Sequence, residues 1–419
     1  MYSDRRGFWR YFGKNEMKDF AERETLRILE AWGYYDASRI PPTRVYVWQK
    51  TYEGQHSDKS PFLESDPALV VFKNGTYDML TDSMKKNDPK DYILNAHEYE
   101  LDTSGRPTPH TDALIAGLVG DAALFLKQYI GYLFYRSYAP AQEMVFFKGD
   151  GGEGKSTFIN FIAKHLIGDE NVSAVSPQEL SDDKFSRVEL LGKNVNLSAD
   201  IPEQFISDSS VLKRLTGCDR LLVQYKGIQG FFMINYAKMI FSANILPRFR
   251  DLSEGFADRL AVIKFINGDQ RKEGATFWKN HDMRKVEAEA PAFAHACMKE
   301  FIKILDGKKA QFSKPKSVTD ATAKWIFDND HVSEFMEAST VIHINDERGE
   351  IAATVHKEYN AFCSDNGYYA KSPQAIRDYL EGVGVPKIRS RHGFNDGGSN
   401  QWRYKGLELV ISYRYADFD

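Results

Sequence analysis

The chain has 419 residues, of which 42% are hydrophobic and 27% charged, and its formal net charge is −4. This length exceeds one ordinary domain, so we expect two or three, with the composition of a soluble globular protein. The charge excludes a uniformly basic protein, although a local basic channel would be enough to bind DNA.

Cysteine usage and apolar runs limit the class further. Cys218, Cys297 and Cys363 are scattered along the chain, which argues against structural zinc and favours a reducing compartment. We find no apolar run of about 18 residues and expect no membrane span. The N-terminus lacks an apolar signal core. These features predict a protein of the cytoplasm.

The first part of the chain, residues 1–110, is expected to be an α/β region. Within it, ALVVFKNGTYDML (68–80) predicts a hairpin with an Asn-Gly turn. The segment RPTPH at 106–110 is typical of a linker. The following stretch, 111–142, begins with a strongly apolar sequence and predicts one or two buried helices, which we assign to a helical collar.

The central part, residues 143–268, predicts an α/β core. MVFFK (144–148) is typical of a buried parallel strand, and a helix is expected over 158–168, ending at Gly168. Because helical stretches lie between several strands, we expect an α/β fold, with a helical connection at 269–318. Further strands are expected at 194–200, 220–226, 231–234, 238–244 and 260–265.

A phosphate-binding motif lies between that first strand and that helix. GDGGEGKST (149–157) matches G-x-x-x-x-G-K-[ST], in which backbone N–H groups cradle phosphates. Lys155 would reach the β- and γ-phosphates of ATP, and the Ser156 hydroxyl would hold Mg²⁺. The alternative is a glycine-rich turn with an incidental Lys-Ser. The expected nucleotide-binding residues are Gly149, Gly152, Gly154, Lys155, Ser156 and Thr157.

Three further polar residues follow predicted strands or precede one. A phosphate loop needs an acid at a neighbouring strand end, and Asp200 fits, with Glu203 as a second candidate. Asn244 could orient the attacking water, and Arg259 could reach a neighbouring subunit's nucleotide as an arginine finger. Each has a plainer alternative: a capped turn for Asp200, an Asx turn for Asn244 and a surface salt bridge for Arg259.

The phosphate loop, Asp200, Asn244 and Arg259 follow one another in the order and spacing of the matching elements in superfamily 3 helicases. They most resemble the helicase part of phage, plasmid and poxvirus primase-helicases. FKNGTYDML resembles the family's NG-x-x-D hairpin, and LFLKQYIGYLFYRS resembles its helix ending in IGY-L. LKRLTGCD (212–219) resembles LK-x-L-T-G-x-D, and SANILPRFRD resembles the N-x-x-P-x-x-x-D sensor segment. The resemblance covers roughly residues 70–270.

The resemblance implies a role for each matching position. Lys155 with its loop matches Walker A, Asp200 the Walker B acid, Asn244 sensor 1 and Arg259 the arginine finger. Many members carry two adjacent acids in Walker B, whereas here Ala199 precedes Asp200. This departure leaves the catalytic base open, with Glu203 as a candidate. In a second departure from the family, no primase domain fits in the short N-terminal region, so we expect a helicase without intrinsic primer synthesis.

A DNA contact is expected just before the sensor strand. In this family a hairpin at that place projects into the pore of a ring, and Lys226 to Phe231 occupies it here. Lys226 would meet phosphates, and Gln229 and Phe231 would lie against sugars or bases. The plain alternative is an ordinary hairpin with one exposed lysine.

The last part, residues 319–419, predicts a winged-helix domain. Its third helix begins at Ser372 and Pro373, and two basic strands follow around an Asn-Asp-Gly-Gly turn. A helix and wing of this kind can bind duplex DNA; a charged face on a protein-docking domain is the alternative. The expected contacts are Arg377, Lys387, Arg389, Arg391, Arg403 and Lys405.

Together these features predict an AAA+-like P-loop core in a homo-hexameric, Mg²⁺-ATP-dependent DNA helicase of a mobile element, in the host cytoplasm. The family implies 3′-to-5′ movement on single-stranded DNA. A separate primase or loader is a candidate further partner. An origin-binding initiator ATPase is the main rival. A small-molecule kinase would not need the finger, hairpin or tail, and no N-K-x-D motif of a GTPase occurs.

Overall fold

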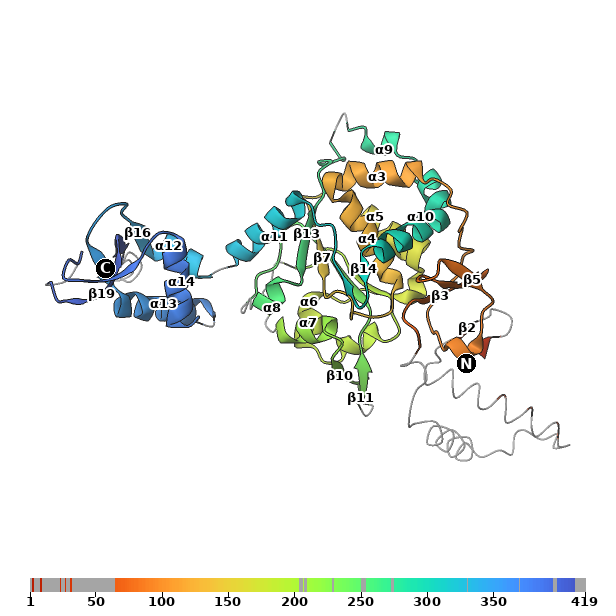
Figure 1. The fold of residues 1–419 in the computed structure, drawn as a ribbon, viewed down its shortest axis with the longest axis horizontal. Coiled ribbons are helices and arrows are strands. Elements are labelled where there is room, and N and C mark those ends of the chain that lie inside the picture. The colour runs from red at the N-terminus through yellow and green to blue at the C-terminus, as the bar shows by residue number, and fades with distance from the viewer. Residues whose placement is uncertain are drawn as a thin grey trace.

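The computed structural model describes most of the chain from residue 65 onward (Figure 1). A core of helices around one parallel sheet is joined through α11 to a smaller C-terminal unit. Before residue 65, it describes positions 2, 3, 8, 9, 23, 27 and 31, with β1 (Tyr2–Ser3) and β2 (Phe8–Trp9). After it, the positions left out are 203–205, 207–208, 228–229, 250–253, 273–274, 330, 369, 395–397 and 411–419.

The central sheet runs in the order β13-β7-β12-β9-β8, and every neighbouring pair is parallel. Both of its faces are covered: Val145 and Phe147 of β7 point into one apolar cluster, and Met144 and Phe146 into the other. Two covered faces explain why these strands are continuously apolar. The predicted α/β class is confirmed. The strands are β7 (Met144–Lys148), β8 (Val172–Ser173), β9 (Val195–Ser198), β12 (Lys238–Ala243) and β13 (Leu260–Lys264).

Helices from distant parts of the chain cover the two faces. On one side, the helices of the predicted collar pack directly on α10 from the predicted helical connection. Gly131, in the IGY-L segment, permits this contact, because a Cβ there would come 2.0 Å from the carbonyl oxygen of Cys297. This side holds α3 (Pro109–Val119), α4 (Ala123–Phe134), α5 (Lys155–Phe161) and α10 (Met283–Lys303). The other side holds α6 (Pro177–Asp182), α7 (Ser209–Thr216) and α11 (Lys316–Asp328).

The α3–α4 stretch, Pro109–Phe134, is long and apolar enough to cross a membrane by length and composition alone, which the sequence expectation had not allowed for. Most of its large apolar side chains, including Leu114, Phe125 and Tyr129, are fully buried in the protein core, whereas Leu124 is 46% exposed. We therefore interpret α3 and α4 as buried core helices.

A small N-terminal sheet packs against the same core in the order β5-β4-β3-β6. The predicted hairpin is confirmed, but its turn differs by one residue from the predicted Asn-Gly turn: Phe72 pairs with Gly75, so Lys73 and Asn74 form the turn. The strands are β3 (Leu69–Phe72), β4 (Gly75–Asp78), β5 (Ser83–Lys85) and β6 (Ala96–His97). Short elements elsewhere are β10 (Arg220–Val223), β11 (Phe231–Ile234), α8 (Glu254–Ala257), α9 (Phe277–Asn280), β14 (Leu305–Asp306) and β15 (Lys309–Ala310).

The C-terminal unit has its own apolar cluster, which begins at Val332. The predicted boundary at residue 319 falls inside α11, whose Trp325 packs on Phe146 of the core. We therefore place the boundary after α11. The unit comprises α12 (His331–Ser339), β16 (Thr340–Ile342), β17 (Gly349–Ile351), α13 (Ala352–Asn366), α14 (Pro373–Gly382), β18 (Lys387–Ser390), β19 (Gln401–Lys405) and β20 (Leu407–Leu409). This order is compatible with a winged helix, which stays a prediction.

Candidate nucleotide site and nucleic-acid interface

The phosphate loop connects the carboxyl end of β7 to the start of α5. Gly154 caps the helix with φ +94°, a left-handed conformation that side chains rarely adopt. A Cβ at Gly154 would lie 2.2 Å from Cζ2 of Trp278, and one at Gly152 would lie 1.9 Å from Oδ1 of Asp269. Glycine at both positions therefore lets other parts of the chain reach the loop.

Lys155 lies inside this loop, and its side chain is only 5% exposed. Its Nζ donates to the carbonyl oxygen of Gly149 at 2.9 Å and to Oδ1 of Asn244 at 3.0 Å. Asn244 lies 89 residues further along the chain, directly after β12. The fold thus brings the predicted phosphate-binding lysine and the predicted sensor residue into direct contact.

The Glu153 carboxylate occupies the centre of the loop. It accepts hydrogen bonds from the backbone N–H of Gly151 at 2.9 Å and from Lys155 at 3.1 Å. Burial alone would raise the pKa of Glu153, but its hydrogen bonds to the backbone and to Lys155 outweigh burial and lower it. An N–H group and an ammonium around one anion are what a phosphate would meet here. The carboxylate therefore occupies hydrogen-bond donors of the kind that bind phosphate.

Asp200, the predicted acidic residue, lies like the phosphate loop at the carboxyl ends of the strands. Asp200 follows β9, and because β12 lies between β7 and β9, Asn244 lies between the loop and Asp200. Ser156, Thr157 and Asp200 are exposed. One hydroxyl and one carboxylate suit Mg²⁺, which keeps several waters and phosphate oxygens as its other ligands. Within the described residues no cluster of three or more His, Cys, Asp or Glu could hold a metal. Glu203 lies outside the described residues.

Arg259 lies at the amino ends of the strands, opposite the end that carries the phosphate loop. Its carbonyl accepts from the N–H of Met144, at the start of β7, whereas the phosphate loop follows the end of that five-residue strand, about 16 Å away. Its guanidinium donates to the Lys213 carbonyl and, at 3.1 Å, to Thr216 Oγ1, both in the LKRLTGCD segment. Burial lowers the pKa of Arg259. Arg259 therefore faces away from its own chain's loop.

A segment that the motifs did not indicate covers the phosphate loop. After β13 the chain forms a covering loop, residues 265–272. Its Gln270 N–H donates to the Gly152 carbonyl at 3.0 Å, and Asn267 Nδ2 donates to the Glu153 carbonyl at 2.8 Å. Nothing in the spacing of these residues indicates a nucleotide site, because only the tertiary contact brings them to the loop.

Two family models match the chain. Residues 10–123 match "D5 N terminal like", a primase-helicase family, and residues 147–259 match a "family of unknown function (DUF5906)". The second match spans the phosphate loop, Asp200, Asn244 and Arg259. The resemblance to phage and viral superfamily 3 primase-helicases is confirmed. Neither match extends beyond residue 259, and no curated protein matches the chain.

Solved structures give weaker likenesses. An apo structure of the NrS-1 C-terminal region, in its A form, is 16% identical with a TM-score of 0.38, covering 56% of this chain and 58% of that one. Another apo structure of that region is 14% identical, TM-score 0.36, covering 74% and 76%. JCV helicase with a bound compound is 12% identical, TM-score 0.32, covering 55% and 63%. The chain thus spans less than two thirds of the first structure. TM-scores in this range do not establish a shared fold, and the relation to primase-helicases rests on the family match.

The hairpin of this primase-helicase-like chain consists of β10 and β11, which are antiparallel, with Val223 paired to Phe231. In Figure 1 it lies at the end of the core opposite α3 and α9. Lys226 is exposed at the turn, and Gln229 lies outside the described residues. Phe231 packs towards the core, whereas Phe232 is 57% exposed. Phe232, one residue from the predicted position, is thus the more exposed of the two rings, and the Arg220 guanidinium lies over it at 5.3 Å.

The predicted basic contacts of the C-terminal unit have very different surroundings. Arg403 is fully buried, and its guanidinium donates to the carbonyl oxygens of Gly349, Ser390 and Ser399. The prediction of a DNA contact by Arg403 is therefore wrong, because its charge holds the strands together. Lys405 pairs with Glu347 at 2.6 Å.

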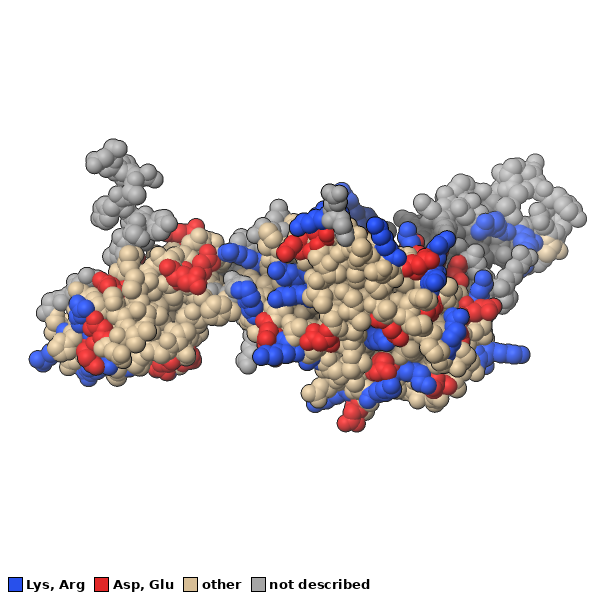
Figure 2. Space-filling view, turned by 90° about the horizontal axis from the view of Figure 1, so that it is seen from above, with Lys and Arg blue, Asp and Glu red and all other residues tan. Residues whose placement is uncertain are grey.

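The other basic residues of the unit are accessible to different degrees. Lys387 lies over the Trp402 ring at 5.7 Å, and Arg377 is half-exposed beside Glu381. Arg389 and Arg391 are exposed. On the face drawn in Figure 2, Lys and Arg are interspersed with Asp and Glu over the core and the C-terminal unit. Arg389 and Arg391 are the predicted contacts best placed to meet a phosphate.

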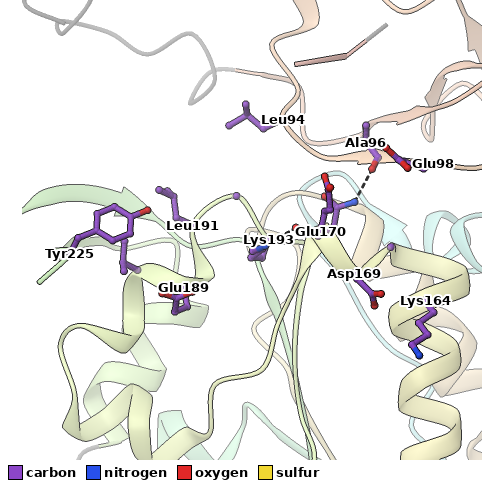
Figure 3. A pocket seen from close by; sticks show the side chains of 14 residues that line it. Leu94, Ala96, Glu98, Lys164, Asp169, Glu170, Glu189, Leu191, Lys193 and Tyr225 are labelled. Atoms are coloured by element: carbon purple, nitrogen blue, oxygen red, sulfur yellow. Dashed lines mark hydrogen bonds between the residues drawn. The ribbon is translucent and has the colours of Figure 1, made fainter. Parts of the chain in front are cut away.

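A cavity of about 620 Å³ lies near the amino ends of β8 and β9, at the end of the strands opposite the phosphate loop (Figure 3). It forms where the N-terminal sheet meets the core, and Asn171 Nδ2 donates to the Ala96 carbonyl there at 2.9 Å. Its charged lining residues are Glu98, Lys164, Asp169, Glu170, Glu189 and Lys193. None of the predicted nucleotide-binding residues lines it, so it is separate from the phosphate site.

Proposed function

We propose that this chain is an ATP-hydrolysing DNA helicase that works as a homo-hexameric ring. The observation that carries the proposal is the 3.0 Å bond between Lys155 and Asn244 inside the phosphate loop, with Asp200 at the next strand end. A phosphate cradle, a polar sensor and an acid at one sheet edge are the parts that phosphoryl transfer to water requires.

In this mechanism, backbone N–H groups of Gly149, Gly152 and Gly154 surround the phosphates of ATP, and Lys155 binds the β- and γ-phosphate oxygens. Binding requires the Glu153 carboxylate to leave the loop. Ser156 and Asp200 would hold Mg²⁺, which neutralises charge on the phosphate oxygens when bound.

The remaining side chains act on the attacking water and the developing charge. Asn244 orients the water, with Glu203 as a candidate base, and Thr157 supports the loop. Arg259 points away from its own chain's phosphate loop, so in a ring it would reach the nucleotide of the next subunit after releasing its hydrogen bonds to Lys213 and Thr216. Catalysis would then depend on assembly, as expected of an arginine finger supplied in trans.

Single-stranded DNA is the proposed substrate of the ring, with Lys226 on phosphates and Phe232 stacking on bases. Several hairpins around one pore would concentrate positive charge that a single chain lacks. By family resemblance we expect 3′-to-5′ translocation. The host-cell cytoplasm is the expected location, and a separate primase or loader is a candidate partner.

The test is unwinding of a forked duplex with one labelled strand, comparing wild type with Lys155→Ala, and ATPase with and without single-stranded DNA. We expect wild type to separate strands and DNA to stimulate its ATPase, and Lys155→Ala to lose both. Lys226→Ala should retain ATPase activity but unwind poorly. An ATPase indifferent to DNA would refute the helicase proposal.

The exposed arginines of the C-terminal unit support a second candidate, an initiator ATPase that binds and melts origin duplex. Arg389 lies on β18 next to the loop that joins it to β19, a position from which wing strands contact phosphate. Tight binding to one duplex sequence, with ATP hydrolysis but no processive unwinding, would favour this candidate over the helicase.

A further inference from the structure

The covering loop carries a cation to the mouth of the phosphate loop. Arg271 Nη2 lies 3.4 Å from the point that a Cβ on Gly151 would occupy, and Asn244 Nδ2 lies 3.9 Å from the same point. The guanidinium and the sensor amide therefore flank the same part of the loop. This is the side on which the proposed mechanism puts the terminal phosphate.

Asp269 holds Arg271 in this position. The guanidinium donates from Nε to Oδ1 at 2.8 Å and from Nη2 to Oδ2 at 3.0 Å, a two-bond fork. The pKa of Arg271 is raised by Asp269 and, further away, by Glu153. The arginine side chain is 71% exposed. Because exposed ion pairs contribute little stability, Arg271 can exchange Asp269 for another anion at small cost.

We propose that Arg271 is a further phosphate-binding residue of the ATP site, acting in the chain that carries the phosphate loop, and that Asp269 holds it ready while nucleotide is absent. The inference rests on the proposed ATPase function. The planar fork that now binds a carboxylate binds phosphate oxygens equally well. Unlike Arg259, Arg271 needs no neighbouring subunit.

The test measures the affinity of the full chain for Mg²⁺-ATP and Mg²⁺-ADP by calorimetry. Arg271→Ala should weaken ATP binding about tenfold, with a smaller effect on ADP, because a charge-assisted fork to the terminal phosphate is lost. Asp269→Asn should leave ATP binding unchanged or strengthen it, because it frees the arginine. Lys272→Ala, an exposed neighbour, should match wild type.

The two variants of the ion pair separate a phosphate contact from a structural role. If Arg271→Ala and Asp269→Asn weaken ATP binding equally, the pair only shapes the loop and the inference is wrong. If Lys155→Ala abolishes binding while Arg271→Ala changes nothing, the inference fails and the ATPase proposal stands. If wild type does not bind ATP, both fail.

Discussion

The phosphate loop and the C-terminal unit were both assigned functions partly from their charged residues, but the structure places those charged side chains in different surroundings. Around the loop, Lys155, Glu153 and Asn244 converge on a single point. In the C-terminal unit, Arg403 is buried, Lys405 is paired with Glu347, and Arg389 is exposed. The same residue type therefore supports the fold at one position and is available to a ligand at another.

The difference comes from what each pattern constrains. The phosphate-loop motif has fixed spacing between a strand and a helix. The backbone conformation of this connection therefore determines where the side chain of Lys155 points. A set of basic residues on a predicted hairpin constrains only the charge of that hairpin. Which of them faces inward depends on strand register, and a shift by one residue reverses it.

Among the variants that test this comparison, Gly154→Ala is expected to have the largest effect, a loss of ATP affinity. The substitution forces a side chain into left-handed backbone and drives a Cβ to 2.2 Å from Trp278, so we expect a loss of ATP affinity of tenfold or more, measured by calorimetry. Gly192→Ala is the matched control, because Gly192 has φ +71° with nothing within 4 Å of its Cβ position. Equal loss in both variants would mean that backbone strain, and not the collision at the loop, determines the effect.

A smaller effect is expected from a pair of arginines in the C-terminal unit. Arg403→Ala removes a buried charge with three carbonyl partners, and should lower the free energy of unfolding by about 3 kcal/mol. Arg389→Ala should leave stability within about 0.5 kcal/mol but weaken duplex binding and lower its salt dependence by about one ion.

Thermal unfolding and duplex binding at several salt concentrations would measure both variants. Stable Arg403→Ala protein with weakened DNA binding would overturn the structural role assigned to Arg403. Unchanged DNA affinity in Arg389→Ala would remove the strongest reason to assign DNA to this unit.

Local signals predicted most of the elements correctly. Gly168 ends the helix after the phosphate loop, and Ser372 caps α14 by accepting from the N–H of Ala375. These features depend on a few neighbouring residues, so a sequence reveals them. The order of the strands in the sheet was not predicted, and the roles of Asp200, Asn244 and Arg259 came from the family resemblance.

Contacts between distant segments that no motif covers could not be predicted. The helical pattern of α11 indicates an apolar face, but not that Trp325 packs on the core instead of the C-terminal unit. The position of Arg271 depends on bonds from the covering loop to Gly152 and Glu153. No periodicity in the sequence encodes such contacts. Those of the covering loop, for example, depend on where β13 ends relative to β7.

The last prediction concerns a histidine, and it extends the comparison to a residue that the sequence left unassigned. His97 is 1% exposed; its Nδ1 bonds the Ile167 carbonyl at 2.9 Å, and its buried Nε2 has no partner among the described residues. Burial lowers the pKa of His97 from 6.5 to about 4. Between these pH values the unfolded chain binds a proton that the folded chain does not, so stability falls as pH falls, by at most about 1.4 kcal/mol per unit.

Urea unfolding midpoints between pH 7 and pH 4 would measure this slope. His97→Gln should be less stable at pH 7, but its midpoint should fall less steeply with pH than that of wild type. His392→Gln, at an exposed position, should keep the wild-type slope. If His97→Gln also keeps it, His97 is not the titrating group, and the link it forms between β6 and the helix after the phosphate loop does not depend on its charge.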